Sequence, residues 1–304
     1  MPQPGGHLAQ SVHHRLLSKA KEQGEDFNLV LIRYALERFL YRLGRSPHKD
    51  RLILKGAMLF AAWTHRPHRP TRDLDLLGIG DSSDAALRQV LSEIVRTPVE
   101  PDGLEFDERG ISISEIREAQ DYPGKRIKLP ARLGNARLNL QIDVGFGDAV
   151  TPGPAEIDYP ALLDLPAPRI RAYPCETVVA EKLQALVTFG IAISRMKDFY
   201  DIWTLSKQFP FDGTSLSAAI AATFERRGTA IPEGVPIALT DEFAADRMKK
   251  TQWTAFVRGN VLTDAPADLS SVVKDLREFL LDPLHTAARG EPFSKSWTRG
   301  GRWV

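Results

Sequence analysis

The chain has 304 residues, of which 43% are hydrophobic and 26% are charged, a composition that excludes an intrinsically disordered protein. Its single cysteine, Cys175, excludes an internal disulfide and a cysteine-rich zinc site. No apolar run approaches the roughly 20 residues of a membrane span, and none follows the first basic residues as in a secretory signal. We therefore expect a cytoplasmic protein that makes no contact with a membrane.

Charge is distributed unevenly along the chain. Residues 1–72 contain 13 Lys and Arg against 5 Asp and Glu, whereas the rest of the chain contains 27 against 34. A basic region joined to an acidic one fits an enzyme that attracts polyanions on one side and holds metal ions on the other. A solvated surface with chance asymmetry explains the charges equally well.

The first helix is predicted over residues 27–43, where apolar residues recur at helical spacing. Asp26 precedes this segment as an N-cap and Gly44 follows it as a stop signal. Three arginines share the face opposite the apolar residues, and we expect that face to be exposed: Arg38, Arg42 and Arg45.

Strands are expected next. Residues 71–79 alternate between polar and apolar, as a half-buried strand does, and residues 83–96 return to helical spacing. Residues 104–146 again show a β pattern, with a turn signal at Gly134. This segment predicts a meander whose last strand carries Asp143.

Residues 151–172 are rich in proline and are predicted to be a connector. After it the pattern becomes helical, with helices expected over 175–189, 194–207, 214–227, 240–258 and 268–281. The sequence predicts an α/β (α+β) protein, with a mixed or antiparallel sheet in its N-terminal lobe, a helical C-terminal lobe and an active site in the cleft between them. The expected parts are 1–150, the connector 151–172, 173–288 and a basic, flexible tail over 289–304.

Two carboxylates dominate the first candidate site. On a strand, Asp73 and Asp75 project from the same face with their Cα atoms about 6.6 Å apart. Carboxylates held so close repel each other unless a cation lies between them, and Mg²⁺ prefers such oxygen ligands. The alternative is a pair of surface acids at a strand end.

A third carboxylate, Asp143, also lies on a predicted strand with apolar neighbours. If that strand lies beside the strand of Asp73, at a spacing of about 4.8 Å, three carboxylates converge. Three carboxylates are enough to hold two metal ions for displacement at an α-phosphate.

The second candidate site lies in the predicted helical lobe. Arg195, Asp198 and Asp201 follow one stripe of a helix, and a helix–turn–helix would bring Lys182 of the preceding helix close to Asp198. A lysine placed there could bind a triphosphate. The alternative is a lattice of ion pairs within the helices.

Together these two blocks resemble the AbiEii/MenT nucleotidyltransferase toxins, a family related to DNA polymerase β. That family has a glycine turn followed by Asp-x-Asp, then a helical lysine and an Arg-x-Lys-Asp-x-x-Asp block. This chain has KGA…RPTRDLDL and AEKLQAL…SRMKDFYDIW, over residues 50–205. It departs from the pattern at Ala57, where serine is usual, and in the basic segment 64–70, which lengthens the gap between Gly56 and Asp73.

The resemblance implies a role for each matching residue. Asp73 and Asp75 would be metal ligands, Lys182 would contact the nucleotide, and Asp198 would be the second essential acid. Asp143 is the candidate third ligand and general base. Further contacts to the nucleotide are expected from Lys55, Gly56, Ala57, Thr71, Arg72, Arg195 and Asp201.

The implied reaction is the transfer of a nucleoside monophosphate from an NTP to an acceptor, with two Mg²⁺ ions and release of pyrophosphate. By analogy with the family, the acceptor is the 3′ end of tRNA, and the protein is a toxin restrained by a cognate antitoxin. Two alternatives stay open. The acceptor could be a protein or a small molecule, or the protein could be a non-catalytic relative that binds nucleic acid or a partner.

Overall fold

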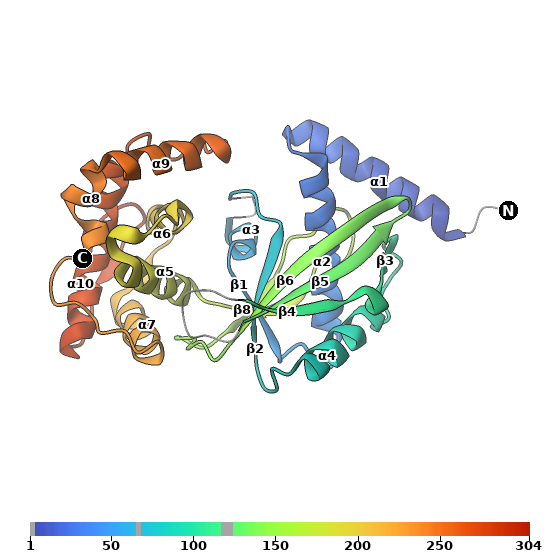
Figure 1. Ribbon diagram of the computed structural model, residues 1–304, viewed down its shortest axis with the longest axis horizontal. Helices are drawn as coiled ribbons and strands as arrows, with labels where there is room; N and C mark the ends of the chain where they lie inside the picture. The colour runs from blue at the N-terminus through green and yellow to red at the C-terminus, as the bar shows by residue number, and fades with distance from the viewer. Residues whose placement is uncertain (1–3, 65–67, 117–123) are drawn as a thin grey trace. The chain divides into compact units, whose positions relative to one another are not determined.

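The computed structural model describes residues 4–64, 68–116 and 124–304 (Figure 1). Residues 65–67 of the predicted basic segment therefore lie outside the described residues. No helix in the described part of the chain is long and apolar enough to cross a membrane.

The chain divides into two compact units. Unit 1 consists of residues 1–147 and 155–172, and unit 2 consists of residues 148–154 and 173–304. The segment predicted as a connector thus contains two strands, and both belong to unit 1.

Unit 1 is built on a mixed sheet with the strand order β3-β5-β6-β2-β1-β8-β7, and β4 also pairs with β5. β2 is parallel to β6 and β1 to β8, whereas all other neighbours are antiparallel. The strands are β1 (Leu52–Lys55), β2 (Asp73–Gly78), β3 (Leu104–Phe106), β4 (Ser112–Ile116), β5 (Gly124–Leu133), β6 (Ala136–Phe146), β7 (Ala155–Asp158) and β8 (Arg169–Ala172). The predicted fold class, with a mixed sheet, is confirmed.

The alternation of residues along β2 and β6 determines which face of the sheet is buried. Leu74 and Leu76 of β2, and Leu140 and Ile142 of β6, are all 0% exposed. Because successive side chains point to opposite faces, the residues between them lie on the other face. The acidic side chains of both strands therefore lie together on the face away from the core.

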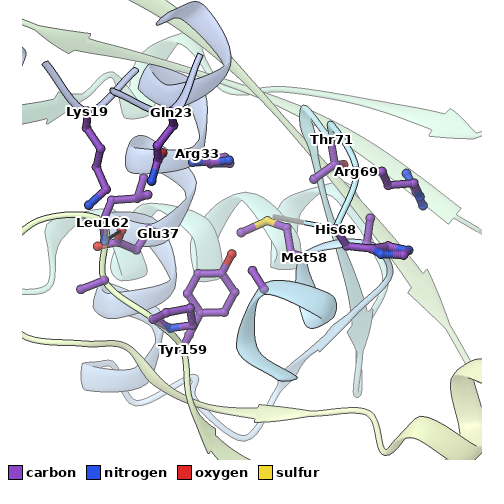
Figure 2. A pocket seen from close by; sticks show the side chains of 14 residues that line it. Lys19, Gln23, Arg33, Glu37, Met58, His68, Arg69, Thr71, Tyr159 and Leu162 are labelled. Carbon is purple, nitrogen blue, oxygen red and sulfur yellow. Dashed lines mark hydrogen bonds between the residues drawn. The ribbon is translucent and has the colours of Figure 1, made fainter. Parts of the chain in front are cut away.

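Four helices complete unit 1: α1 (Pro4–Gln23), α2 (Phe27–Arg45), α3 (Met58–Thr64) and α4 (Asp84–Arg96). α2 packs against β6 and β8 and contacts α1 and α4. The predicted N-cap is confirmed, because Asp26 accepts a hydrogen bond of 3.0 Å from the Leu29 N–H. Residues of α1, α2 and α3 also line a cavity of about 190 Å³ (Figure 2).

The stop predicted at Gly44 is wrong, because α2 continues to Arg45, two residues beyond the predicted end at 43. A Cβ atom at Gly44 would lie 3.3 Å from the carbonyl carbon of Arg169, and closer still to its oxygen. Glycine is therefore required here for the close approach of α2 to β8 and not for ending the helix.

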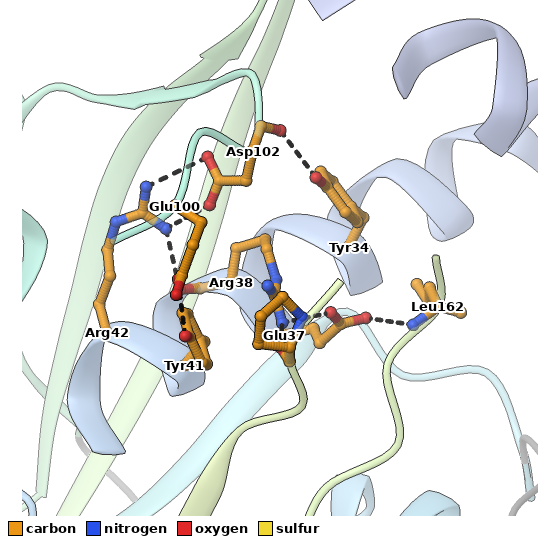
Figure 3. A network of polar contacts seen from close by, with 9 residues as sticks. Tyr34, Glu37, Arg38, Tyr41, Arg42, Glu100, Asp102 and Leu162 are labelled. Atoms are coloured by element: carbon orange, nitrogen blue, oxygen red, sulfur yellow. Dashed lines mark hydrogen bonds and ion pairs between the residues drawn. The ribbon is translucent and has the colours of Figure 1, made fainter. Parts of the chain in front are cut away.

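The prediction of an exposed arginine face on α2 is wrong for two of its three members. Arg45 is exposed, but Arg38 is 1% exposed and Arg42 is 6% exposed. Segments distant in sequence pack over this face and supply hydrogen-bond acceptors (Figure 3). The periodicity of α2 contains no information about these distant segments. The prediction from periodicity alone was therefore an exposed arginine face.

The acceptors make the burial of these guanidinium groups possible. Arg42 donates to both carboxylate oxygens of Asp102, at 2.6 and 3.2 Å. Arg38 donates to the Pro166 carbonyl at 2.7 Å and forms an ion pair of 2.8 Å with Glu37 (Figure 3). Burial of a charge is tolerated when it is paired and hydrogen-bonded in this way.

Unit 2 is mainly helical. It contains α5 (Cys175–Phe189), α6 (Met196–Gln208), α7 (Gly213–Arg226), α8 (Asp241–Ala245), α9 (Arg247–Gly259) and α10 (Leu269–Arg289), with a short pair of strands, β9 (Phe211–Asp212) and β10 (Ser296–Trp297). The helix predicted over 240–258 is broken at Asp246, which accepts a hydrogen bond from the Lys249 N–H as the N-cap of α9. α10 extends beyond its predicted end at 281 and contains Pro283.

The segment after α10, predicted to be a loose tail, is packed against the helices of unit 2. β10 pairs with β9, and Trp297 is 3% exposed. Pro283 has no N–H to donate to the Phe279 carbonyl four residues earlier, and the indole N–H of Trp303 donates to that carbonyl instead, at 3.0 Å. The tail therefore satisfies a backbone acceptor that the helix itself cannot satisfy.

Candidate active site

A row of charged residues crosses four strands of the unit 1 sheet. Lys55 of β1 pairs with Asp75 of β2, Asp75 pairs with Asp143 of β6, and Asp143 pairs with Arg126 of β5. Directly paired residues lie on the same face of a sheet. Asp73 lies on this face too, two residues before Asp75. We call these five residues the sheet cluster: Lys55, Asp73, Asp75, Arg126 and Asp143.

Asp143 is held by the arginine opposite it. The Nε and Nη2 atoms of Arg126 donate to the two carboxylate oxygens of Asp143 at 2.9 and 2.7 Å. The Nε2 atom of Gln141 donates to one of those oxygens at 3.3 Å. Asp143 is 15% exposed and Arg126 is 40% exposed, so solvent reaches this pair from the arginine side.

Gly56 lies directly against Asp75. Its φ of +76° is a left-handed conformation, and a Cβ atom there would lie 2.8 Å from the Asp75 Cγ. Only glycine fits both requirements. The turn between β1 and α3 thus brings backbone onto the Asp75 carboxylate.

The remaining residues predicted around this turn take different positions. Ala57 and Thr71 line the cavity shown in Figure 2. The Thr71 hydroxyl donates to the Asp73 carbonyl at 3.3 Å, whereas Arg72 is exposed. The structure therefore groups Ala57 and Thr71 around one cavity and leaves Arg72 at the surface.

Unit 2 brings together the second predicted set, which we call the helix cluster: Lys182, Arg195, Asp198 and Asp201. The Nζ atom of Lys182 on α5 lies 2.7 Å from Asp198 Oδ1 and 2.8 Å from Asp201 Oδ2. The Nε atom of Arg195 lies 2.7 Å from Asp198 Oδ2. Both aspartates are 0% exposed, whereas Lys182 is 12% and Arg195 is 40% exposed.

Electrostatics within the helix cluster favour an ionised Asp198. Burial alone would raise the pKa of Asp198, but Lys182 and Arg195 beside it outweigh that effect and hold its pKa below the ordinary value. The aspartates in turn fix the cationic side chains, which are the only parts of the cluster with measurable exposure.

The ion pairs of Arg126 and Arg227 with neighbouring carboxylates were not predicted from the sequence. Arg227 of unit 2 lies 3.2 Å from Asp148 and 3.4 Å from Glu181, and donates to Gln184 at 2.9 Å. Its position after a helix carried no recognisable signal. Arg126 did carry one, because counting back from the turn at Gly134 places it opposite Asp143.

The carboxylates of the sheet cluster suit a magnesium ion in type and position. They offer only oxygen donors, and Asp75 and Asp143 are direct neighbours on adjacent strands. Within the described residues, however, no three His, Cys, Asp or Glu side chains are arranged as a ready metal site. Both oxygens of Asp143 already accept hydrogen bonds from Arg126. Binding a metal there would require Asp143 to exchange partners.

Comparison with protein families gives one match that covers most of the chain. The profile described as "Nucleotidyl transferase AbiEii toxin, Type IV TA system" matches residues 38–280. That range contains every residue of the sheet cluster and of the helix cluster. None of the curated proteins compared with the chain matches it.

Two solved structures from Helicobacter pylori are similar to this chain. One is the structure of JHP933, with a TM-score of 0.44 and 14% identity over 84% of this chain and 91% of that one. The other is described as that of a candidate nucleotidyltransferase, with a TM-score of 0.44 and 14% identity over 84% of this chain and 94% of that one.

Proposed function

The chain belongs to the AbiEii family of nucleotidyl transferase toxins of type IV toxin–antitoxin systems, and on that premise we propose that it transfers a nucleoside monophosphate from an NTP to the 3′ end of tRNA. The observation that carries this proposal is the pairing of Asp75 with Asp143 on adjacent strands, with Asp73 on the same face. That arrangement of carboxylates suits phosphoryl chemistry.

Asp73, Asp75 and Asp143 would hold Mg²⁺, which when bound would stabilise the negative charge that develops around the α-phosphorus. In the transfer, the acceptor hydroxyl oxygen forms a bond to the α-phosphorus. The bond from that phosphorus to the oxygen bridging to the β-phosphate breaks, and pyrophosphate leaves. Asp143 is our candidate to take the hydroxyl proton, which requires it to release Arg126.

Lys182 and Arg195 are proposed to bind the triphosphate of the donor. Each is a cation with some exposure, and each is held by an aspartate that has none. Asp198 contacts both of them, so its role would be to fix their orientation. A preorganised cation of this kind binds phosphate without first having to be ordered.

The proposed acceptor is supported by charge. The excess of Lys and Arg in residues 1–72, 13 against 5 acidic residues, suits a polyanion such as tRNA better than a neutral small molecule. The family also implies a partner protein, the antitoxin, which would restrain the activity. We expect the reaction to take place in the cytoplasm, where tRNA is charged and used.

A transfer assay tests the proposal. The protein would be incubated with total tRNA, Mg²⁺ and each α-labelled NTP in turn, beside an Asp73→Asn variant. Asp50→Asn is the matched control, because it removes an exposed carboxylate from the same unit. We expect label in tRNA from the parent and the control, and none from Asp73→Asn or in the presence of chelator. Absence of label from a folded parent with every NTP would reject the tRNA acceptor.

A further inference from the structure

The cavity in unit 1 belongs to none of the groups described above. Five segments supply its walls: α1, α2, α3, the residues just before β2 and the residues just after β7. Figure 2 shows Lys19 on one side, Arg69 on the other, Arg33 above and Met58 near the centre. A cavity of about 190 Å³ admits a group of the size of a nucleobase.

Part of the cavity wall is apolar. Met58, Ala61 and Leu162 provide apolar walls, and Tyr159, which is 6% exposed, adds an aromatic ring. The Tyr159 hydroxyl points toward the centre of the cavity (Figure 2). The lining also includes polar side chains, among them Gln23 and Thr71, so the cavity offers both apolar contact and hydrogen-bonding partners to a flat heterocycle.

Three cationic side chains also line the cavity. Lys19, Arg33 and Arg69 line the cavity, whereas Glu37 is the only carboxylate among its lining residues and is paired with Arg38. Arg33 is itself paired with Glu25 at 2.9 Å and is 17% exposed. Mixed apolar and polar walls beside several cations match the two halves of a nucleotide, its base and its phosphate.

The cavity also adjoins the sheet cluster through covalent neighbours. Ala57 lines it and follows Gly56, the residue that lies against Asp75. Thr71 lines it and donates to the carbonyl of Asp73. The cavity thus shares the turn at Gly56 and the residues before β2 with the segments that carry the proposed catalytic carboxylates.

We propose that this cavity is an acceptor subsite, which takes the terminal nucleotide of the nucleic acid that receives the transferred group. The base enters the cavity toward the Tyr159 hydroxyl, and Lys19, Arg33 and Arg69 bind the phosphate. The assignment of the cavity to the acceptor rests on the proposed function. Nucleotide binding by the cavity can be measured separately from catalysis.

Two substitutions test the subsite. Lys19→Met removes a cation beside the cavity, and Tyr159→Phe removes the hydroxyl while keeping the ring. Lys21→Met is the matched control for the first, because Lys21 is an exposed lysine of the same helix that does not line the cavity. We expect Lys19→Met to raise the KM for tRNA about tenfold, since loss of a charged hydrogen bond is worth that much, and to leave the KM for NTP unchanged. Tyr159→Phe should raise the KM for tRNA by a smaller factor.

A binding measurement separates this inference from the proposed function. Fluorescence anisotropy of labelled tRNA, without NTP, would give the dissociation constant for each variant, and AMP would serve as the competitor. Weaker binding by Lys19→Met and Tyr159→Phe, together with competition by AMP, supports the subsite even if no transfer is detected. Equal binding and equal KM values for Lys19→Met and Lys21→Met would overturn it. A rise in the KM for NTP in place of tRNA would overturn it as well, because the cavity would then serve the donor.

Discussion

In the sheet cluster of unit 1, Asp143 is 15% exposed and shares its oxygens with an arginine that is 40% exposed, whereas in the helix cluster of unit 2 both aspartates are 0% exposed. The two clusters use the same residue types. Solvent can replace a partner of a partly exposed carboxylate at little cost, but a buried carboxylate that loses its cation is left uncompensated. The sheet cluster is therefore suited to exchanging ligands and the helix cluster to holding its cations still.

The largest expected effect is on catalysis by the sheet cluster. Asp75→Asn should reduce nucleotide transfer by about a thousandfold or more, because a lost metal ligand costs several kcal/mol at the transition state. Its unfolding free energy in urea should change by no more than about 1 kcal/mol. A variant that loses stability as well as activity would remove the contrast between the two clusters.

Substitutions in the helix cluster should lower stability as well, in addition to weakening the donor binding proposed for Lys182. Lys182→Met leaves Asp198 and Asp201 without their shared cation, and we expect a loss of about 3–5 kcal/mol in urea unfolding. Lys207→Met is the matched control, because its ion pair with Asp275 is partly exposed and should contribute about 1 kcal/mol or less. Equal losses of unfolding free energy in the two variants would mean that the buried ion pairs of the helix cluster contribute no more stability than a partly exposed pair.

A pH series tests the charge state of the helix cluster. The folded-state pKa of Asp198 lies below its ordinary value of 3.8, so ionised Asp198 contributes stability above that pH and loses it as the pH falls through the lowered pKa. The difference in unfolding free energy between the parent and Asp198→Asn should therefore be constant near neutral pH. It should narrow below pH 3.8 as Asp198 becomes protonated. A difference that stays constant at low pH would show that Asp198 is not held ionised.

The smallest expected effect concerns Arg126. If this arginine competes with Mg²⁺ for Asp143, Arg126→Met should lower the Mg²⁺ concentration needed for half-maximal transfer by up to about tenfold. Lys128→Met, on the same face of β5 but opposite Gln141, is the control. A higher Mg²⁺ requirement in Arg126→Met would instead make Arg126 a residue that positions Asp143 for the metal.

Much of this arrangement follows from local rules. Asp26 was recognisable as a cap, the Asp-x-Asp alternation placed both carboxylates on one face, and helical spacing with a short turn predicted the approach of Lys182 to Asp198. The position of Arg126 opposite Asp143 was also within reach of the sequence, because a hairpin turn sets the register of both of its strands.

The features that could not be predicted depend on segments far apart in the chain. Arg38 is buried because the carbonyl of Pro166 lies over it, and no periodicity in α2 encodes that carbonyl. The cavity is lined by five segments, so no single motif records it. The role of Trp303 became visible only with the carbonyl that Pro283 leaves without its helical donor.

The path of the chain limits how this protein can be dissected or recombined. The backbone passes from unit 1 to unit 2 and back, crossing three times, at residues 147–148, 154–155 and 172–173. A fragment ending at residue 147 would lack β8, and β1 would become an unpaired sheet edge that is prone to aggregate. Each unit is made of two segments of the chain, so a single cut cannot separate the complete units. The carboxylates of the sheet and the cations of the helices are therefore difficult to separate by truncation.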